Sequence, residues 1–311
     1  MTVLGNVEEL SRLRGPVALA IGVFDGVHLG HQKVIQAAQD FAAKQDGTAV
    51  VMTFDPHPLR VLRPKVAPRL LCSTRHKLRI MEQCGVGCVY LAPFNETTAK
   101  TSASDFIGAL VNSCKPLGFV SVGYTWTFGK DREGNIHELM ELGESHAFGV
   151  YGVSALQVDG EVVSSTLIRE AVRAGDFAKA KKFLGRDYSV FGNVVQGKQL
   201  GRELGFPTAN LAVENEELPP KGVYVVSAKT PGSRVPVIKG VANLGLRPTV
   251  SDGATERSLE VHLLDFEGDL YGSEMEVAFI KMLRPEHKFA GLDQLKEQIA
   301  RDVVAAREIG A

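Results

Sequence analysis

The chain has 311 residues, of which 44% are hydrophobic and 23% are charged, and this composition is ordinary for a globular protein. Its formal net charge of −1 gives no electrostatic reason to expect a nucleic-acid or anionic-membrane partner. No apolar run reaches the roughly 18 residues of a membrane span, and the N-terminus lacks a hydrophobic signal core, so we expect neither feature.

The first 185 residues alternate strand patterns with helix patterns, and the total length favours two domains. Strands are predicted over 17–23, 48–54, 88–94, 119–123 and 150–158. Helices are predicted around the periodic segment 34–42 and over 76–83, 102–114, 137–146 and 164–184, the last interrupted near Gly175. This alternation indicates a doubly wound parallel sheet, which binds ligands at the carboxyl ends of its strands.

The turn after the first predicted strand contains His28-Leu29-Gly30-His31. By chance, an H-x-G-H string is expected only roughly 0.02 times in a chain of this composition, although a motif remains a hypothesis. A helix N-terminus directs unpaired N–H groups at an anion, and glycines let a phosphate approach the backbone. The turn therefore predicts a nucleoside triphosphate site without a Walker lysine, the other interpretation being two solvated loop histidines.

Two further segments fall where this sheet would present them to a ligand. Pro56 and Pro58 stop the second strand, either as a simple turn or as the rim of a site. Three hydroxyl residues, 164–166, open the last predicted helix. Hydroxyl side chains cap helices, and they also hold anions beside a cation such as Arg169. The residues alone leave both pairs of interpretations open.

After residue 185 the pattern changes to short strands separated by glycine and proline turns. These strands are predicted over 189–195, 222–229, 235–242, 259–266 and 275–283. A helix pattern returns only at the end, where Leu292, Leu295, Ile299 and Val303 share one face. The second part therefore reads as a small antiparallel β-barrel with a C-terminal helix, and we place the domain boundary at 185–188.

Oxygen-bearing side chains mark two places in the second part. Residues 201–211 read G-R-E-L-G-F-P-T-A-N-L, which we interpret as an irregular loop. Thr208 and Asn210 offer hard oxygen donors that suit Mg²⁺, although a polar turn is the commoner explanation of such residues. Glu260 lies on the strand face opposite Leu259 and Val261, where a solvated carboxylate is the usual case.

The four cysteines, at positions 72, 84, 88 and 114, are too few for a disulfide scaffold. Cys84 and Cys88 have a spacing that a metal pair can use, but no second Cys or His pair lies near them in the sequence. The simpler interpretation is that they are small apolar residues in a reducing compartment, so we expect a cytoplasmic protein.

The glycine-histidine turn resembles the H-x-G-H motif of the nucleotidyltransferase superfamily. Its longer form, G-V-F-D-G-V-H-L-G-H-Q, is similar to one branch, the bacterial bifunctional riboflavin kinase/FAD synthetases. The string G-R-E-L-G-F-P-T-A-N resembles the signature of riboflavin kinases, and the resemblance extends over about residues 15–306. It implies a Rossmann-like FMN adenylyltransferase domain over 1–185 and a β-barrel riboflavin kinase domain over 186–311.

The resemblance also implies roles for single residues. In the kinase step, Glu260 is the base near the riboflavin 5′-hydroxyl, and Thr208 and Asn210 hold Mg-ATP. In adenylyl transfer, His28 and His31 stabilise charge on the triphosphate. The residues implied to bind the cosubstrates are Gly22, Phe24, Gly30, Thr125, Ser164, Ser165, Thr166 and Arg169 in the first domain and Gly201, Asn243 and Arg284 in the second.

The implied reactions are phosphorylation of riboflavin by ATP to FMN and adenylylation of FMN by a second ATP to FAD, with release of pyrophosphate. Mg²⁺ is expected in both sites. The expected partners are riboflavin, FMN and ATP, without a nucleic acid or a membrane, and an oligomer is left unassigned.

One segment departs from the family pattern, because Thr125 stands where Asp or Asn is usual and Trp126 replaces Phe. A hydroxyl has less reach than a carboxylate or an amide. A monofunctional riboflavin kinase with an impaired adenylyltransferase domain is therefore one alternative. Trp126 either stacks on a planar ring or packs in the core. A non-catalytic flavin or nucleotide sensor is a second alternative, which the intact candidate residues disfavour.

Overall fold

The computed structural model describes residues 1–197, 200–230, 237–248 and 255–309. It divides into two compact units. The first comprises Met1–Arg69 and Thr74–Ser165, and the second comprises Leu70–Ser73 and Thr166–Ala311. No helix in the described ranges is long and apolar enough to cross a membrane.

The first unit is built on one six-stranded sheet whose neighbouring strands are all parallel. Its spatial order is β1 (Thr2–Leu4), β4 (Cys88–Pro93), β3 (Thr48–Asp55), β2 (Val17–Ile21), β5 (Leu117–Gly123) and β6 (Gly149–Val153). All five residues of β2 are buried, as expected of a central strand covered on both faces. The predicted parallel sheet is confirmed. The sequence analysis missed β1, because three residues are too few to display a period.

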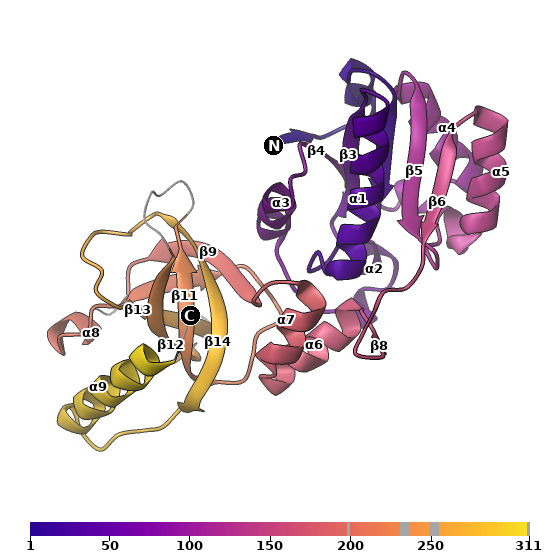
Figure 1. The fold of residues 1–311 in the computed structure, drawn as a ribbon. Helices are drawn as coiled ribbons and strands as arrows, with labels where there is room; N and C mark the ends of the chain where they lie inside the picture. The colour runs from indigo at the N-terminus through magenta and orange to yellow at the C-terminus, as the bar shows by residue number, and fades with distance from the viewer. Residues whose placement is uncertain (198–199, 231–236, 249–254, 310–311) are drawn as a thin grey trace. The chain divides into compact units, whose positions relative to one another are not determined.

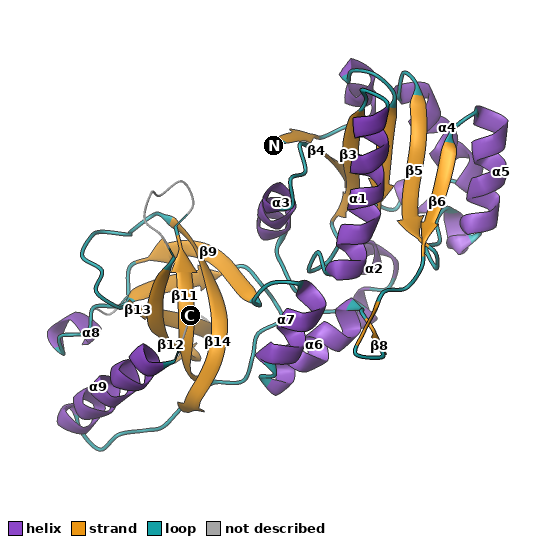
Figure 2. Cartoon of the chain, viewed as in Figure 1, coloured by secondary structure: helices purple, strands orange, loops and turns teal. Residues whose placement is uncertain are grey.

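The α-helices of this unit lie around the sheet, and the first of them runs along one face, as Figures 1 and 2 show. They are α1 (Leu29–Lys44), α2 (Pro58–Leu62), α3 (Thr74–Gln83), α4 (Ala103–Ser113) and α5 (Ile136–His146). Helix α1 buries Val34, Ile35, Ala38 and Ala42, and it packs against β2, β3 and β5. The i, i+4 and i+8 spacing of these residues is what places them on one face.

The predicted strand over 150–158 is wrong at its end. Strand β6 stops at Val153, and β7 (Gln157–Val158) pairs instead with β8 (Glu161–Val162) in a separate antiparallel hairpin. The turn between them is Asp159-Gly160, and both residues have positive φ, at 52° and 81°. An Asp-Gly pair is the preferred two-residue hairpin turn, so this local signal ends the parallel strand.

The second unit begins with two helices, α6 (Ser165–Ala174) and α7 (Phe177–Leu184), although the first residue of α6 clusters with the first unit. Gly175 has φ of 74°, and the Asp176 side chain caps α7, so the predicted break near Gly175 is confirmed. Helices α8 (Leu200–Glu203) and α9 (Leu292–Glu308) complete the helices of this unit that the structure describes.

Six antiparallel strands close into the predicted barrel. Their order is β10 (Ala209–Val213), β13 (Thr255–Leu263), β12 (Ile238–Pro248), β11 (Gly222–Lys229), β14 (Glu274–Pro285) and β9 (Ser189–Val195). On β14, Met275, Val277 and Phe279 are buried at every second position, the alternation of a filled barrel. Val223 and Val225 of β11 cluster with Ala306 of α9, so α9 covers the outer face of that strand.

The sequence analysis missed β10, which lies in the segment predicted as an irregular loop. A Pro-Thr-Ala-Asn string carries turn-type residues, and pairing with two neighbouring strands overrides that local preference. Strands β12 and β13 are also displaced from the ranges predicted for them, 235–242 and 259–266. Residues 235 and 236 lie outside the described residues.

Candidate active sites

The histidine turn connects β2 to α1 at the carboxyl edge of the parallel sheet. His28 is the N-cap of α1, and its Nδ1 accepts a hydrogen bond of 3.2 Å from the backbone N–H of His31. The two imidazole rings stack, with centroids 3.5 Å apart and planes 16° from parallel. Because Nδ1 of His28 is an acceptor, a neutral His28 carries its proton on Nε2. The structure therefore brings both predicted histidines together at a helix N-terminus.

Two glycines and Phe24, whose backbone is strained, surround the two histidine rings. Phe24 has φ of 52°, and its ring meets His31 edge-on at 5.3 Å between centroids. A Cβ on Gly22 would lie 3.0 Å from the Phe24 ring, and one on Gly30 would lie 3.2 Å from the His28 ring. Both glycines thus accommodate the rings of the turn, and their contact with a cosubstrate stays a prediction.

The serine segment reaches the same turn. The Ser165 hydroxyl donates a hydrogen bond of 3.0 Å to the backbone carbonyl of Asp25, which is buried. Ser164 and Ser165 cluster with the first unit, whereas Thr166 and Arg169 cluster with the second. Arg169 is buried, with 8% of its surface exposed. The structure therefore joins Ser165 to the turn, and the roles of Ser164, Thr166 and Arg169 in binding a cosubstrate stay predictions.

Thr125 and Trp126, which depart from the family pattern, follow β5. Thr125 is exposed. Trp126 is half-buried and stacks on Phe128, with centroids 4.7 Å apart and planes 9° from parallel. Phe128 belongs to the core of the first unit, and Trp126 packs against that core. Of the two interpretations of Trp126, the structure supports core packing.

Sequence reasoning passed over Lys77, which contacts Thr53 beside the histidine turn. The Lys77 side chain from α3 is buried, and its Nζ lies 3.0 Å from the Thr53 hydroxyl at the end of β3. Both residues also bond to the carbonyl of Val23, which directly precedes the strained Phe24. A lysine in an amphipathic helix is normally expected on the solvated face, so nothing in the sequence indicates that Lys77 is buried.

In the barrel, strand register aligns three of the predicted residues. Asn210 of β10 pairs with Glu260 of β13, and Glu260 pairs with Asn243 of β12. Directly opposed residues project from the same face, with Cβ atoms about 5 Å apart. Val223 of β11 continues this row, and it packs under α9. The row of Asn210, Glu260 and Asn243 therefore lies on the outer face of the barrel.

Asn210 has an environment that suits a metal ligand. It is 7% exposed, and among the described residues its buried Oδ1 has no hydrogen-bond partner. An acceptor buried without a partner costs free energy, and a hard cation such as Mg²⁺ would satisfy it. Thr208, two residues earlier, is half-buried and supplies a hydroxyl. The donor set of Thr208 and Asn210 thus fits Mg²⁺, which retains several waters and phosphate oxygens.

The loop that carries Thr208 is held from two sides. A ring nitrogen of His262, Nδ1, lies 2.8 Å from the Pro207 carbonyl, and the His262 ring meets Phe206 edge-on at 5.6 Å. A Cβ on Gly201 would lie 3.2 Å from the Thr208 hydroxyl oxygen. Gly201 therefore permits the close approach of α8 to this loop, and its contact with ATP stays a prediction.

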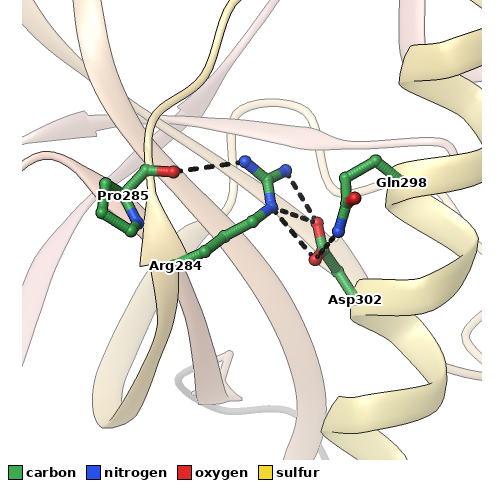
Figure 3. A network of polar contacts seen from close by, with 4 residues as sticks. All are labelled: Arg284, Pro285, Gln298 and Asp302. Atoms are coloured by element: carbon green, nitrogen blue, oxygen red, sulfur yellow. Dashed lines mark hydrogen bonds and ion pairs between the residues drawn. The ribbon is translucent and has the colours of Figure 1, made fainter.

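Arg284 fastens α9 to the end of β14 (Figure 3). Its Nη2 lies 2.8 Å from Asp302 Oδ2, and its Nε lies 3.1 Å from both carboxylate oxygens. Asp302 is 5% exposed and also accepts a hydrogen bond of 2.9 Å from Gln298. The guanidinium carbon lies 5.6 Å from the Phe289 ring centroid. The structure places Arg284 in this network, and its contact with a cosubstrate stays a prediction.

The cysteines form no candidate site. All four are free thiols, and burial raises the pKa of Cys114 to about 12, which keeps it protonated and unreactive. Within the described part of the chain, no group of three or more His, Cys, Asp or Glu residues is arranged to hold a metal ion.

Comparison with known proteins matches a different family model to each part of the chain. A family model described as FAD synthetase matches residues 11–167, and one described as riboflavin kinase matches residues 184–310. The bifunctional riboflavin kinase/FMN adenylyltransferase of Escherichia coli K12 is 40% identical over 309 residues, which cover 99% of this chain and 97% of that protein. The protein of the same name from Pseudomonas fluorescens is 39% identical over 298 residues, 96% of this chain and 94% of that one.

A crystal structure from Streptococcus pneumoniae, described as a macrolide-efflux protein, matches with a TM-score of 0.82. It is 27% identical, and the match covers 100% of both chains.

Proposed function

The chain belongs to the family of bifunctional riboflavin kinase/FMN adenylyltransferases, and from that membership we propose which of its residues carry each reaction. The enzyme phosphorylates riboflavin to FMN and adenylylates FMN to FAD, consuming one ATP in each reaction. We assign phosphorylation to the barrel unit and adenylyl transfer to the parallel-sheet unit. What supports this division is that the FAD synthetase model matches residues 11–167 and the riboflavin kinase model matches residues 184–310.

In the barrel, Glu260 is proposed to act as the general base. A carboxylate there orients the riboflavin 5′-hydroxyl and accepts its proton as the oxygen attacks the γ-phosphorus of ATP and ADP leaves. Its cross-strand neighbours, Asn210 and Asn243, flank it on the outer face of the barrel. Thr208 and Asn210 would hold Mg²⁺, which supplies charge neutralisation to the ATP phosphates. The buried, unpartnered Oδ1 of Asn210 supports this assignment.

In the parallel-sheet unit, a phosphate oxygen of FMN attacks the α-phosphorus of ATP and pyrophosphate leaves. Negative charge grows on the triphosphate in that step, and preorganised donors stabilise it. His28 and His31 are proposed as those donors, because they stack at the N-terminus of α1, where the helix dipole also favours an anion. The hydroxyls of Ser164 and Ser165, which cluster with the same unit, are proposed to bind other phosphate oxygens. The roles of Thr166 and Arg169, which cluster with the second unit, stay predictions.

One assay tests the function and the metal requirement together. Purified protein is incubated with riboflavin, ATP and Mg²⁺, and the flavins are separated over time. We expect FMN to appear first and FAD to follow, and EDTA to stop both until Mg²⁺ is restored in excess. FMN without FAD would indicate the monofunctional kinase, and neither product would indicate the sensor. Product formation unaffected by EDTA would contradict the proposed metal requirement.

In the cell, the protein must be located where riboflavin and ATP are present. A cytoplasmic location remains our proposal, and the four free thiols agree with a reducing environment.

A further inference from the structure

A buried lysine lies beside the histidine turn without belonging to it. Lys77 of α3 is 6% exposed, and lysine is rarely buried to this degree unless its ammonium is hydrogen-bonded. Its Nζ lies 3.0 Å from Thr53 Oγ1, 3.3 Å from the Val23 carbonyl oxygen and 3.5 Å from the Phe54 carbonyl oxygen. The ammonium therefore joins the carboxyl ends of two adjacent strands.

These contacts converge on one carbonyl group. The Thr53 hydroxyl, fully buried, donates a hydrogen bond of 2.9 Å to the Val23 carbonyl and accepts one from Lys77. The Val23 carbonyl therefore receives two donors, one from Thr53 and one from Lys77. Val23 follows the last residue of β2 by two positions, so this pair of bonds fixes the backbone where it leaves the sheet.

The fixed carbonyl determines the orientation of the next residues. Phe24 follows directly and has φ of 52°, a conformation that a residue with a Cβ keeps only when its surroundings hold it. Its ring meets His31 edge-on, and His31 stacks on His28. A continuous set of contacts thus runs from Lys77 to both histidines.

We propose that Lys77, together with Thr53, is a positioning residue for adenylyl transfer, holding the histidine turn in the geometry that stabilises the triphosphate. The proposal rests on the proposed function of the parallel-sheet unit. A small misplacement of catalytic donors can lower a rate about 10²-fold. A positioning role therefore predicts a loss in kcat rather than in substrate binding.

The test compares Lys77→Met and Thr53→Val with Thr53→Ser in the full chain. For the first two variants we expect kcat for FMN adenylylation to fall about 10- to 100-fold, with KM for FMN and ATP within about threefold of wild type. Thr53→Ser keeps the hydroxyl, so its kcat should stay close to that of the wild type. Lys44→Met, an exposed lysine at the far end of α1, is the matched control and should leave both activities unchanged.

A second measurement does not depend on activity. Stacked imidazoles shift each other's ring-proton resonances, so NMR signals of His28 and His31 should move toward those of free histidine in Thr53→Val and in Lys77→Met. Valine has nearly the same shape as threonine, so Thr53→Val still tests the proposal if Lys77→Met fails to fold. The riboflavin kinase rate of the same samples reports whether the second unit is folded.

Normal kcat in folded Thr53→Val and Lys77→Met would overturn the proposal. A loss of activity with unchanged histidine resonances would overturn it too, since the histidine turn would then keep its geometry without the lysine. If the wild-type protein made no FAD from FMN and ATP, the proposed function would fall, while the histidine resonances would still decide whether Lys77 holds the turn.

Discussion

His28 combines two tasks that single substitutions can separate. Its Nδ1 caps α1 by accepting the His31 N–H, which leaves Nε2 as the proton donor of a neutral ring. Asparagine is as good an N-cap as any residue, but it lacks a second ring nitrogen. The side chain at position 28 therefore offers a way to distinguish helix capping from stabilisation of the triphosphate.

We predict that His28→Asn and His28→Ala both lower FAD formation from FMN by about 10²–10³-fold, the usual loss for one preorganised donor. Only His28→Ala should also lose about 1 kcal/mol of stability, because it removes the cap. FMN formation should not change, since the barrel carries that reaction. Full adenylylation activity in His28→Asn would reduce the role of His28 to capping.

Glu260 poses the corresponding question in the kinase site. Glu260→Gln keeps the shape of the side chain but removes its charge and its capacity to accept a proton. We predict that kcat for riboflavin phosphorylation falls by about 10²–10⁴-fold, the span of general acid–base groups, while adenylylation of added FMN is unchanged. Glu267→Gln, an exposed carboxylate in the turn after the same strand, is the control. Equal rates in both variants would remove Glu260 from the mechanism.

At the scale of elements, one partly buried ion pair contributes to the contact between α9 and the barrel. The Asp302 and Arg284 side chains are only 6% and 21% exposed, and Gln298 completes the network (Figure 3). Removing one partner of such a pair leaves the other charge poorly solvated, which is costly. By contrast, Arg301 and Glu297 on the same helix are 69% and 70% exposed, and surface pairs contribute little.

We therefore predict that Asp302→Leu lowers the free energy of unfolding of the second unit by about 2–4 kcal/mol, less than a fully buried pair because Arg284 retains some solvent. Arg301→Leu should lower it by about 0.5 kcal/mol or less. Urea titration followed by circular dichroism measures both. The double variant Arg284→Leu/Asp302→Leu should be more stable than Asp302→Leu alone. Equal stability of Asp302→Leu and wild type would refute the view that this pair fastens α9.

At the scale of the whole molecule, the folding units differ from the division by motifs. Helices α6 and α7 precede the predicted boundary at 185–188, yet they cluster with the barrel. Phe177 of α7 packs against both Tyr224 and Phe279, with ring centroids 5.8 and 5.6 Å away. Burying one such side chain contributes about 2–3 kcal/mol. The predicted boundary itself stays a prediction until fragments are made.

Two fragments test it, 166–311 and 186–311. Both contain Thr208, Asn210 and Glu260, so both should convert riboflavin to FMN. We predict that the longer fragment melts about 5–10 °C higher, because the shorter one exposes the surface that Phe177 covers. Phe177→Ala in the longer fragment should remove most of this difference. Equal melting temperatures would show that α6 and α7 are dispensable for the barrel.

Local patterns in the sequence determined most of the elements and indicated candidate residues in both units. The strands over 189–195 and 222–229 were predicted at their observed bounds, because short apolar runs bounded by glycine and proline turns are local signals. The predicted place of the histidine motif, between a strand and a helix, is confirmed for the same reason, because the strand, the glycine turn and the helix follow one another directly. The spacing of these residues only made them candidates, and the resemblance to a family then implied a chemical role for each.

Only the tertiary structure decided which distant residues meet. Asn210, Glu260 and Asn243 become neighbours through strand register, which no single strand contains. The ammonium of Lys77 and the pairing of Arg284 with Asp302 likewise depend on packing between separate elements. Periodicity reports which face of an element is apolar, but the partner of that face is set by the closure of the barrel and the stacking of helices on the sheet, which depend on the whole chain.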